Sequence, residues 1–597
     1  MIRRGPGPGF ARPKIKAKDM VGTLKRLVKY LAFARTKLIL VFFLVLCTAV
    51  FGIIGPYLVV IAIDKFIIPG NLRGLALLTA GMIALYAVNA LFHWLQASIM
   101  VSLAQTTVGR IRQEVFAKIQ TLPLKFFDTS ERGDLMSRLT NDVDNISQVL
   151  SSSVTQVFNS VITLAGVLVM MLYLSPSLTL ANLAVIPLML IITRKVAEVS
   201  RGYFMQQQAA LGELNGFIEE TISGQKVVKV FTREQKMLDK FATLNTNYRN
   251  VGTKAQILSG FIPPFMNILN NLNFAVVAAL GGWLVVRNMI SIGVIGGFLT
   301  YSRQFTRPVM ELSNLFNMIQ AAMAGAERVF EVLDQAPEPA DAPDAAVPER
   351  IEGEVRFSDV SFAYEQGQPV LHDITLEAKP GQVIALVGHT GAGKTTIINL
   401  LTRFYDIDQG RITIDGLDIR QIKRDRLRSL LGIVLQDTYL FAASVKDNIR
   451  YGRLDATDAE VEQAAKLANA HAFITRLPNG YDTVLSEDGS NLSQGQRQLL
   501  AIARAILADP AILILDEATS SVDTRTEQQI QSAMLQLMKG RTSFVIAHRL
   551  STIRNADLIV VIDQGRIVEQ GKHQELLNRK GFYYNLYMSQ FSTAVQG

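Results

Sequence analysis

The sequence predicts an α-helical membrane domain fused to an α/β domain, and three observations support this fold class. Four long stretches in the first half contain no Asp, Glu, Lys or Arg. A proline-rich acidic segment then separates this half from the rest of the chain. Beyond it, short apolar runs alternate with more polar, helix-like segments, which is typical of an α/β domain.

The charge-free stretches are long enough for membrane-spanning helices, which need about 20 apolar residues each. They cover residues 38–63, 74–109, 145–193 and 255–286, and their lengths are 26, 36, 49 and 32 residues. The third stretch is broken at Ser175-Pro176-Ser177, a turn signal, and therefore predicts two helices. A further apolar segment begins at Met289. We therefore expect six spans.

Three charged residues recur every four positions in the sixth predicted span: Arg303, Arg307 and Glu311. On one helix face they would line a central cavity, because polar groups at membrane depth usually serve function. The alternative is that this part of the helix lies at the membrane interface, where such side chains pair or reach water. The aromatic and Met residues of the spans define no substrate site.

Charge predicts the orientation of the membrane domain. Residues 1–37 contain eleven Lys and Arg residues and one acidic residue, Asp19. The positive-inside rule places them in the cytoplasm, and six spans then place both termini and the α/β domain on the cytoplasmic side of the inner membrane. Four Leu and Val residues between positions 24 and 31 share one helix face, which favours a short interfacial helix before the first span.

Two long charged segments, residues 110–144 and 194–254, separate pairs of spans. Both are rich in good helix formers, so we expect the spanning helices to continue well into the cytoplasm. Each pair of extended helices would be joined by a short segment, near residues 137–145 and near residues 221–230. A solvated loop is the alternative for both segments.

The proline-rich acidic segment marks the domain boundary. We expect a cytoplasmic N-terminus with the interfacial helix, the membrane domain, a linker and the α/β domain. These cover residues 1–37, 38–334, 335–350 and 351–597. Strands in the α/β domain are expected at residues 354–357, 382–387, 411–414, 511–515, 542–547 and 558–562.

Composition argues against two other classes of protein. The formal net charge is +9, but the basic residues are spread over segments predicted to lie beside a membrane, so no nucleic-acid partner is expected. The single cysteine, Cys47, lies in the first apolar stretch. An intrachain disulfide framework or a cysteine-based metal cluster is therefore excluded.

A phosphate-binding loop is predicted at Gly388–Thr396. Its sequence, Gly-His-Thr-Gly-Ala-Gly-Lys-Thr-Thr, satisfies the pattern G-x-x-x-x-G-K-[ST] between an apolar run and a helix-like segment. The glycines let backbone N–H groups approach phosphate, and the following helix directs its positive end at the same anion. Lys394 would reach the β- and γ-phosphates of ATP, and Thr395 would bind Mg²⁺. The ATP contacts expected from the loop are Gly388, Thr390, Gly391, Gly393, Lys394, Thr395 and Thr396.

Two adjacent carboxylates extend this site. Asp516 ends the apolar run 511–515 and is followed by Glu517. In NTPases with a phosphate loop, an acid at the end of such a strand holds Mg²⁺. Glu517 would then polarise the attacking water. An acidic pair alone is common in other folds, but together with the loop it predicts ATP hydrolysis.

The order of further motifs resembles that of the ATP-binding cassette (ABC) transporters, and the resemblance covers nearly the whole chain. The motifs are Tyr364, the phosphate loop, Gln436, Leu492-Ser493-Gln494-Gly495-Gln496, Asp516-Glu517, Ser520-Ser521-Val522-Asp523 and His548. Six spans with long cytoplasmic extensions followed by one nucleotide-binding domain form the layout of an exporter half-transporter. The Leu-Ser-x-Gly-Gln element is specific, because other phosphate-loop proteins lack it.

The resemblance implies that three residues act on the γ-phosphate and the attacking water. Glu517 would polarise the water, His548 would contact the γ-phosphate and help hold Glu517 in place, and Gln436 would reach Mg²⁺ or the water. Tyr364 would stack on adenine. The Mg²⁺ ligands implied are Thr395, Gln436 and Asp516.

In this family ATP is held between the phosphate loop of one subunit and the Leu-Ser-x-Gly-Gln element of the other, so one chain does not complete a site. Ser493, Gly495 and Gln496 would bind nucleotide from the start of a helix, and Asp523 would act across the dimer. Gln494 replaces the usual glycine, and its side chain could crowd the approach to phosphate. The chain thus resembles the catalytically competent subunit of bacterial heterodimeric multidrug exporters; a homodimer is the alternative.

The function implied is ATP-driven export of amphipathic or hydrophobic compounds, of multidrug type, by alternating access across the cytoplasmic membrane. The partners would be a second half-transporter subunit, membrane lipid and a small amphipathic substrate. A lipid flippase or a peptide exporter is the alternative within transport. An ATP-gated channel or regulator is the alternative from another class, although the Asp516-Glu517 pair favours turnover.

Overall fold

The structure is a computed structural model that describes residues 19–365, 367–436, 438–516, 523–547 and 550–591. The chain divides into two compact units. The first contains Met1–Leu122 and Phe126–Pro337, and the second contains Pro123–Lys125 and Glu338–Gly597. The first unit is helical, and the second combines helices with two sheets.

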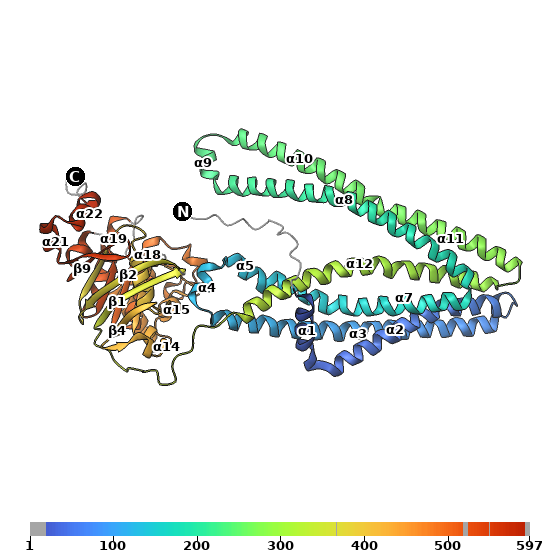
Figure 1. Ribbon diagram of the computed structural model, residues 1–597, viewed down its shortest axis with the longest axis horizontal. Helices are drawn as coiled ribbons and strands as arrows, with labels where there is room; N and C mark the ends of the chain where they lie inside the picture. The colour runs from blue at the N-terminus through green and yellow to red at the C-terminus, as the bar shows by residue number, and fades with distance from the viewer. Residues whose placement is uncertain (1–18, 366, 437, 517–522, 548–549, 592–597) are drawn as a thin grey trace. The chain divides into compact units, whose positions relative to one another are not determined.

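Long α-helices build the first unit (Figure 1). They are α2 (Arg35–Ile61), α3 (Leu72–Gln120), α7 (Val154–Leu174), α8 (Pro176–Ser223), α10 (Glu234–Gly260), α11 (Ile262–Val286) and α12 (Ile292–Asp334). The break expected at residues 175–177 is confirmed, because α7 ends and α8 begins there. Ser175 caps α8 by accepting a hydrogen bond from the Leu178 N–H. Pro176 fits the first turn, where a backbone N–H has no helical partner.

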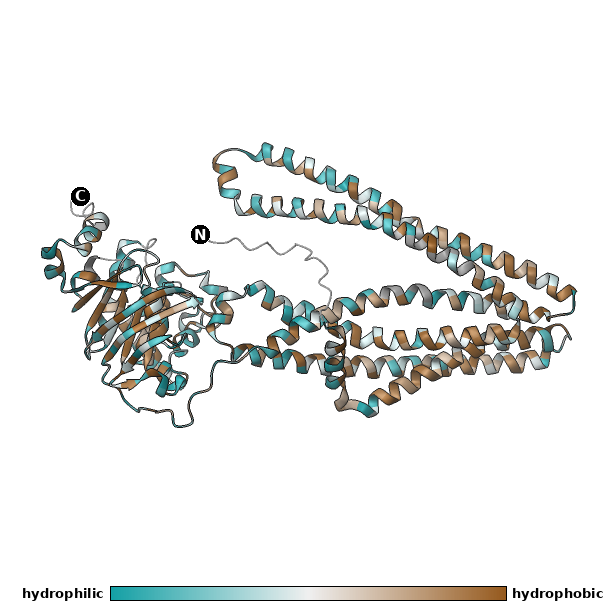
Figure 2. Cartoon of the chain, viewed as in Figure 1, coloured by the Kyte–Doolittle hydropathy of each residue, from teal (hydrophilic) through white to brown (hydrophobic). Residues whose placement is uncertain are grey.

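Four helical segments of the described chain are long and apolar enough to cross a membrane. They are Met20–Ile67, Leu72–Gln120, Arg132–Leu174 and Glu234–Val286. Figure 2 shows apolar residues along much of these helices, whereas the ends of α8 and α10 near α9 (Gln225–Val230) are largely hydrophilic. The expected helical membrane domain is therefore confirmed. The number of six spans stays a prediction.

The first of the two predicted helical extensions turns at a different place from the one we expected near residues 137–145. Helical structure is continuous from Arg132 to Leu174, through α5 (Arg132–Ser137), the π-helical segments η3 (Arg138–Asp142) and η4 (Val149–Ser153), α6 (Val143–Gln148) and α7. The chain turns instead around α4 (Leu124–Thr129). Pro123 contributes to this turn, because proline lacks an N–H and disfavours helix at the preceding residue.

A tertiary contact explains why the polar stretch 137–145 stays helical. Asp142 is buried, and its carboxylate accepts a 2.8 Å hydrogen bond from Arg328 Nε of α12. The side chain that favours a turn in isolation is thereby used between helices. The second expected junction is confirmed, since α9 lies within residues 221–230 and joins α8 to α10.

The short helix predicted before the first span is α1 (Met20–Leu31), and Asp19 caps it through the Gly22 N–H. Leu27 and Leu31 are buried in a core shared with α3 and α12, whereas Leu24 and Val28 are exposed. Only part of the expected apolar face therefore packs on the protein. The location of this helix at a membrane interface stays a prediction.

Two sheets organise the second unit. The larger has the order β10-β9-β3-β8-β7-β6, formed by β10 (Arg566–Gly571), β9 (Leu558–Asp563), β3 (Val383–Val387), β8 (Thr542–Ile546), β7 (Ile512–Asp516) and β6 (Leu431–Val434). All neighbours except the antiparallel β10–β9 pair are parallel. The smaller sheet is antiparallel, with the order β2 (Gln368–Ala378), β1 (Val355–Glu365), β4 (Gln409–Ile414) and β5 (Leu417–Asp418).

All six expected strands are present, as β1, β3, β4, β7, β8 and β9. The prediction missed β2, β5, β6 and β10. The last of these alternates exposed and half-buried residues at the sheet edge, and β6 has only four residues. Such strands carry a weaker apolar signal than the buried parallel strands.

The acidic residues after α12 pair with basic residues of the second unit. Arg428 Nη2 lies 2.6 Å from Glu338 Oε1, and the Arg424 N–H donates to Asp341 at 2.9 Å. The Ala346 N–H donates to the Gln421 carbonyl at 2.7 Å. The segment that the sequence predicts as linker is therefore held to α14 (Arg424–Ser429) and its surroundings from Glu338 onward.

Candidate functional site

Parallel strands direct several predicted ATP-site residues to one edge of the larger sheet. The phosphate loop follows β3, Gln436 follows β6 and is exposed, and Asp516 is the last residue of β7. The C-terminal ends of parallel strands share an edge, which is where α/β sheets bind ligands. The fold therefore gives these residues a common location.

Glycine is required at three positions of the phosphate loop. Gly391 and Gly393 have φ angles of +86° and +108°, a region that side chains rarely adopt. A Cβ atom at Gly393 would lie 2.6 Å from Leu371 Cδ2. A Cβ atom at Gly388 would lie 2.1 Å from the Ile562 carbonyl oxygen. Conformation and close packing thus explain the glycines of the pattern.

Lys394 begins α13 (Lys394–Leu401) and folds its side chain over the loop. Its Nζ donates to the carbonyl oxygens of Gly388 and His389, at 2.7 and 2.8 Å. The residue is 8% exposed. Burial lowers the pKa of Lys394, and the negative charge of Asp516 opposes this shift. A partly buried ammonium with mainly neutral acceptors favours an incoming anion.

The other loop residues divide by exposure. Thr390, Gly391 and Thr395 are exposed, whereas Thr396 is buried and its hydroxyl accepts a 3.3 Å hydrogen bond from Tyr364. Within the described residues, no group of three or more His, Cys, Asp and Glu side chains is placed to hold a metal ion. Thr395 and Asp516 do offer hard oxygen ligands, which fit an Mg²⁺ ion that also binds ATP phosphates.

Tyr364 is fixed beside the helix that follows the loop. Its hydroxyl donates to Thr396 and accepts from Asn399 Nδ2 at 3.2 Å. Its ring centroid lies 4.9 Å from those of Phe362 and Tyr405, and the rings are nearly perpendicular. The structure therefore brings Tyr364 together with α13.

The Leu-Ser-x-Gly-Gln element forms the start of α18 (Gln494–Ala508). Ser493 accepts a hydrogen bond from the Gln496 N–H at 3.3 Å, and Gln496 Oε1 accepts one from the Ser493 N–H at 2.9 Å. This reciprocal capping box defines the helix start. Leu492 and α18 belong to a core that differs from the core around the phosphate loop. The two motifs are thus built on separate cores of one unit.

Asp523 caps α19 (Thr524–Met538) by accepting a hydrogen bond from the Thr526 N–H at 3.0 Å. This bond lowers the pKa of the Asp523 carboxyl group. Glu517, His548 and residues 520–522 lie outside the described residues. Their roles stay predictions.

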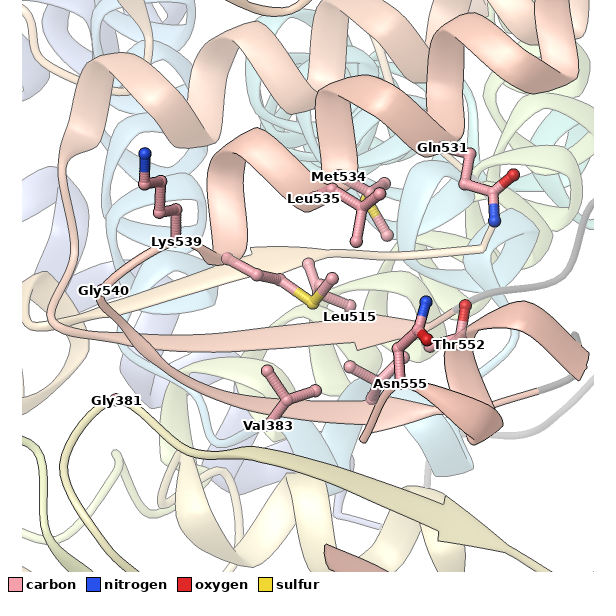
Figure 3. A pocket seen from close by; sticks show the side chains of 12 residues that line it. Gly381, Val383, Leu515, Gln531, Met534, Leu535, Lys539, Gly540, Thr552 and Asn555 are labelled. Atoms are coloured by element: carbon pink, nitrogen blue, oxygen red, sulfur yellow. The ribbon is translucent and has the colours of Figure 1, made fainter. Parts of the chain in front are cut away.

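An apolar cavity of about 270 Å³ also lies in the second unit (Figure 3). Met534, Leu535 and Met538 of α19 line it, together with Val383 and Leu515. None of the phosphate-loop residues is part of this lining. The cavity is therefore distinct from the predicted ATP site.

The helical unit contains a polar cavity of about 510 Å³ between α2, α3, η4, α7 and α12. Arg307 and Glu311 line it, and Arg307 Nε lies 2.8 Å from Glu311 Oε1. Arg303 is not in the lining. Two of the three charged residues therefore face a cavity and also pair with each other, and the location of this part of the helix at the membrane interface stays a prediction.

Sequence reasoning missed the five amide residues of this cavity: Asn89, Gln96, Gln156, Asn159 and Gln304. The first two lie in the charge-free stretch 74–109, where attention to charge alone passes over them. The available signal was an uncharged polar side chain at membrane depth.

The fold and these sites define a membrane protein with a phosphate-loop ATPase unit. Two family profiles match the chain: the ABC transporter transmembrane region over residues 38–309, and the ABC transporter over residues 371–520. The chain therefore belongs to the ABC transporter family. It is an exporter half-transporter in which ATP hydrolysis is coupled to transport.

Relatives of known sequence and structure align over nearly the full length. An uncharacterized ABC transporter ATP-binding protein of Bacillus subtilis is 50% identical, over 97% of this chain and 96% of the relative. The fatty acid ABC transporter ATP-binding/permease protein of Mycobacterium tuberculosis is 42% identical, over 96% and 97%. The ATP-dependent lipid A-core flippase of Syntrophus aciditrophicus is 40% identical, over 90% and 89%. A bacterial Atm1-family ABC exporter with ATP bound is 32% identical with a TM-score of 0.73, over 94% and 99%.

Proposed function

We propose that this chain is one half of a dimeric exporter that moves lipid-like amphipathic compounds across the cytoplasmic membrane. The observation that carries this proposal is that relatives sharing both units are named for fatty acid transport and for lipid A-core flipping. The basic N-terminal 37 residues support a cytoplasmic location of both termini and of the nucleotide unit. Multidrug substrates, which the sequence also suggested, are the competing proposal within transport.

Uncovered apolar side chains at one end of the helical unit support a dimer. α8 and α10 form a long hairpin that α9 closes (Figure 1). At this end Val227, Val230 and Phe231 are exposed, Val230 by 78%. Apolar residues gathered at the tip of a hydrophilic hairpin indicate a contact surface. A second half-transporter subunit would cover it.

The phosphate loop and Asp516 would hold Mg²⁺ and ATP, with Tyr364 on the adenine. Supporting this role are the glycine-dependent loop shape and the buried Lys394 ammonium. Bound Mg²⁺ would supply charge neutralisation at the phosphates. The residues proposed to contact ATP and Mg²⁺ are Tyr364, Gly388, Thr390, Gly391, Gly393, Lys394, Thr395, Thr396, Gln436, Ser493, Gly495, Gln496, Asp516 and Asp523. Glu517, His548 and Gln436 are the proposed catalytic residues.

We infer a heterodimer from Gln494, whose side chain is half-buried at the first residue of α18. The experiment is steady-state ATPase of the purified chain alone and with a candidate second half-transporter, each with and without Glu517→Gln. Substantial activity should require the second subunit. Substantial ATPase of the chain alone that Glu517→Gln abolishes would establish a homodimer instead.

The substrate class is tested by ATPase measurements in lipid vesicles. We expect long-chain amphipathic lipids to raise the ATPase rate of the assembled dimer severalfold, whereas cationic dyes of similar hydrophobicity should have little effect. Stimulation by the dyes alone would favour multidrug export.

A further inference from the structure

The polar cavity of the helical unit has a lining of unusual composition for a membrane protein. Amides and hydroxyls dominate it, and serine and threonine residues of η4 and α7 form one wall. Thr48 and Gly52 of α2 face the same space. Single-turn π-helical segments within longer helices, such as η4, are frequently found at functional sites.

Three amide oxygens of this lining have no hydrogen-bond partner among the described residues: Asn89 Oδ1, Gln96 Oε1 and Gln304 Oε1. Gln96 is only 8% exposed. A buried amide without a partner is unfavourable, and native proteins usually satisfy such groups. The oxygens therefore indicate a missing hydrogen-bond donor in the cavity.

The orientation of Gln304 is fixed by its surroundings. Its Nε2 donates to the Gly52 carbonyl oxygen at 3.3 Å, and a carbonyl can only accept. Its Oε1 is thus the end without a partner. Four residues later Pro308 lacks the N–H that would normally bind the Gln304 carbonyl. Gln304 therefore offers acceptors to the cavity, whereas Arg307 supplies the donors of this part of α12.

One acidic and one basic residue face each other in the lining. Arg307 and Glu311 form an ion pair at 2.8 Å, and His93 is the third ionisable residue of the lining. A carboxylate, a phosphate or a cationic amine entering the cavity would have to compete with an existing partner. An uncharged ligand with several hydroxyl groups would instead supply donors to the amide oxygens and acceptors to the serine and threonine hydroxyls.

The cavity also lies at a depth suited to a lipid head group. α3 begins at Leu72. At about 1.5 Å per residue, Asn89 and Gln96 lie about 26 and 36 Å along the helix, near the opposite side of a hydrocarbon core about 30 Å thick. In the orientation proposed above, this is the cytoplasmic side.

We propose that this cavity receives the uncharged, hydroxyl-rich head group of a glycosyl lipid, whose acyl chains stay in the bilayer. Gln96 and Gln304 bind sugar hydroxyls and determine the preference for this head group. This inference rests on the proposed export of lipid-like compounds and narrows their class.

The experiment uses the full chain, with its partner subunit if activity requires one, in nanodiscs of phosphatidylcholine. Three dioleoyl lipids with different head groups are added in turn: glucosyl diacylglycerol, diacylglycerol and phosphatidic acid. The readout is the lipid concentration that half-maximally stimulates ATPase, with oleic acid as a fourth probe. The variants are Gln96→Leu and Gln304→Leu. Gln105→Leu is the matched control, because Gln105 lies on the same helix as Gln96 but outside the lining.

We expect glucosyl diacylglycerol to act at the lowest concentration. Each cavity variant should raise that concentration by about 3- to 10-fold, the size of one lost hydrogen bond, and should leave the response to oleic acid unchanged. The control should match the wild type. Equal responses to all four probes, or no effect of either cavity variant on the glucosyl lipid, would overturn the inference while leaving lipid export intact. If no lipid stimulates ATPase, the proposed export of lipids fails as well.

Discussion

The ammonium group of Lys394 donates hydrogen bonds to two carbonyl oxygens of its own loop. Phosphate oxygens carry more charge than carbonyl oxygens, so an incoming triphosphate would form stronger hydrogen bonds with this group. The lowered pKa of Lys394 points the same way, because burial makes the ammonium costly until an anion compensates it.

Lys394→Met should therefore abolish ATP binding and lower ATPase by at least about 100-fold. At an ATP concentration about 100 times the Kd, the wild type should gain about 2.7 kcal/mol of stability, and the variant should gain none. Thermal unfolding with and without Mg²⁺ and ATP measures this. Lys379→Met, an exposed lysine of the same unit, is the control. If ATP raised the unfolding temperature of the Lys394 variant as much as that of the wild type, Lys394 would have no role in ATP binding.

A second prediction concerns Gln494, which we expect to impair the ATP site that it completes. Glycine at this position would let the backbone come closer to a phosphate than glutamine does. Gln494→Gly should therefore raise the ATPase of the assembled dimer by about 3- to 10-fold if the glutamine impairs the site that it completes. An unchanged rate would mean that glutamine is tolerated there.

At the scale of elements, two helices of the nucleotide unit begin with the same capping box. Thr457 and Glu460 start α16 (Asp458–Leu467), and Ser493 and Gln496 start α18. The helices have similar caps, but only the second carries the Leu-Ser-x-Gly-Gln element. A comparison of variants at the two caps therefore distinguishes the contribution of a cap to stability from a contribution to nucleotide binding.

Thr457→Ala and Ser493→Ala should each destabilise the unit by about 1 kcal/mol. Only Ser493→Ala should also lower ATPase beyond what this loss of stability explains. Chemical denaturation and ATPase assays of both variants measure the difference. Equal ATPase in the two variants would limit Ser493 to its capping role.

The C-terminal helices α21 (His573–Arg579) and α22 (Phe582–Phe591) are joined by a hydrogen bond of 2.6 Å between His573 Nδ1 and the Tyr583 hydroxyl. Burial lowers the pKa of His573, and the positive charge of Arg554 lowers it further. The unfolded state therefore binds the proton more readily than the folded state. The contribution of His573 to the free energy of unfolding is therefore fully present above the pKa of about 6.5 that histidine has in the unfolded chain. This contribution is lost as the pH falls below that value.

The thermal unfolding temperature of the wild type should therefore fall between about pH 7.5 and pH 5.5 by more than that of His573→Gln. Differential scanning calorimetry of the full chain measures both. His372→Gln provides a histidine control in the same unit. A wild-type slope equal to that of His573→Gln would assign the pH dependence to other groups.

At the scale of the whole molecule, strong local signals predicted most of the architecture. The charge-free stretches and buried parallel strands are recognisable because burial on all sides leaves a continuous apolar run. The junction expected at 137–145 was wrong because Asp142 pairs with Arg328 of a helix far along the chain, which no local pattern reveals. The phosphate loop was predictable for a similar local reason, since its glycines serve backbone geometry.

The polar cavity was not predictable to the same extent. Its amides come from α3, α7 and α12, and those of α3 and α12 are more than two hundred residues apart, so that only the packing of the helices brings them together. Arg307 and Glu311 were visible as charges in a span, but their pairing depends on side-chain geometry. Motifs that act through the backbone are thus easier to recognise than sites assembled between helices.

The central claim is that ATP hydrolysis by this chain drives export of a lipid-like compound. The most direct measurement is ATP-dependent translocation of a fluorescent lipid analogue in inside-out vesicles that contain the assembled dimer. The wild type should accumulate the analogue in the lumen only with ATP, and Glu517→Gln should reduce the initial rate to that of vesicles without protein. Equal translocation with and without ATP, or in the wild type and the Glu517→Gln variant, would contradict the claim.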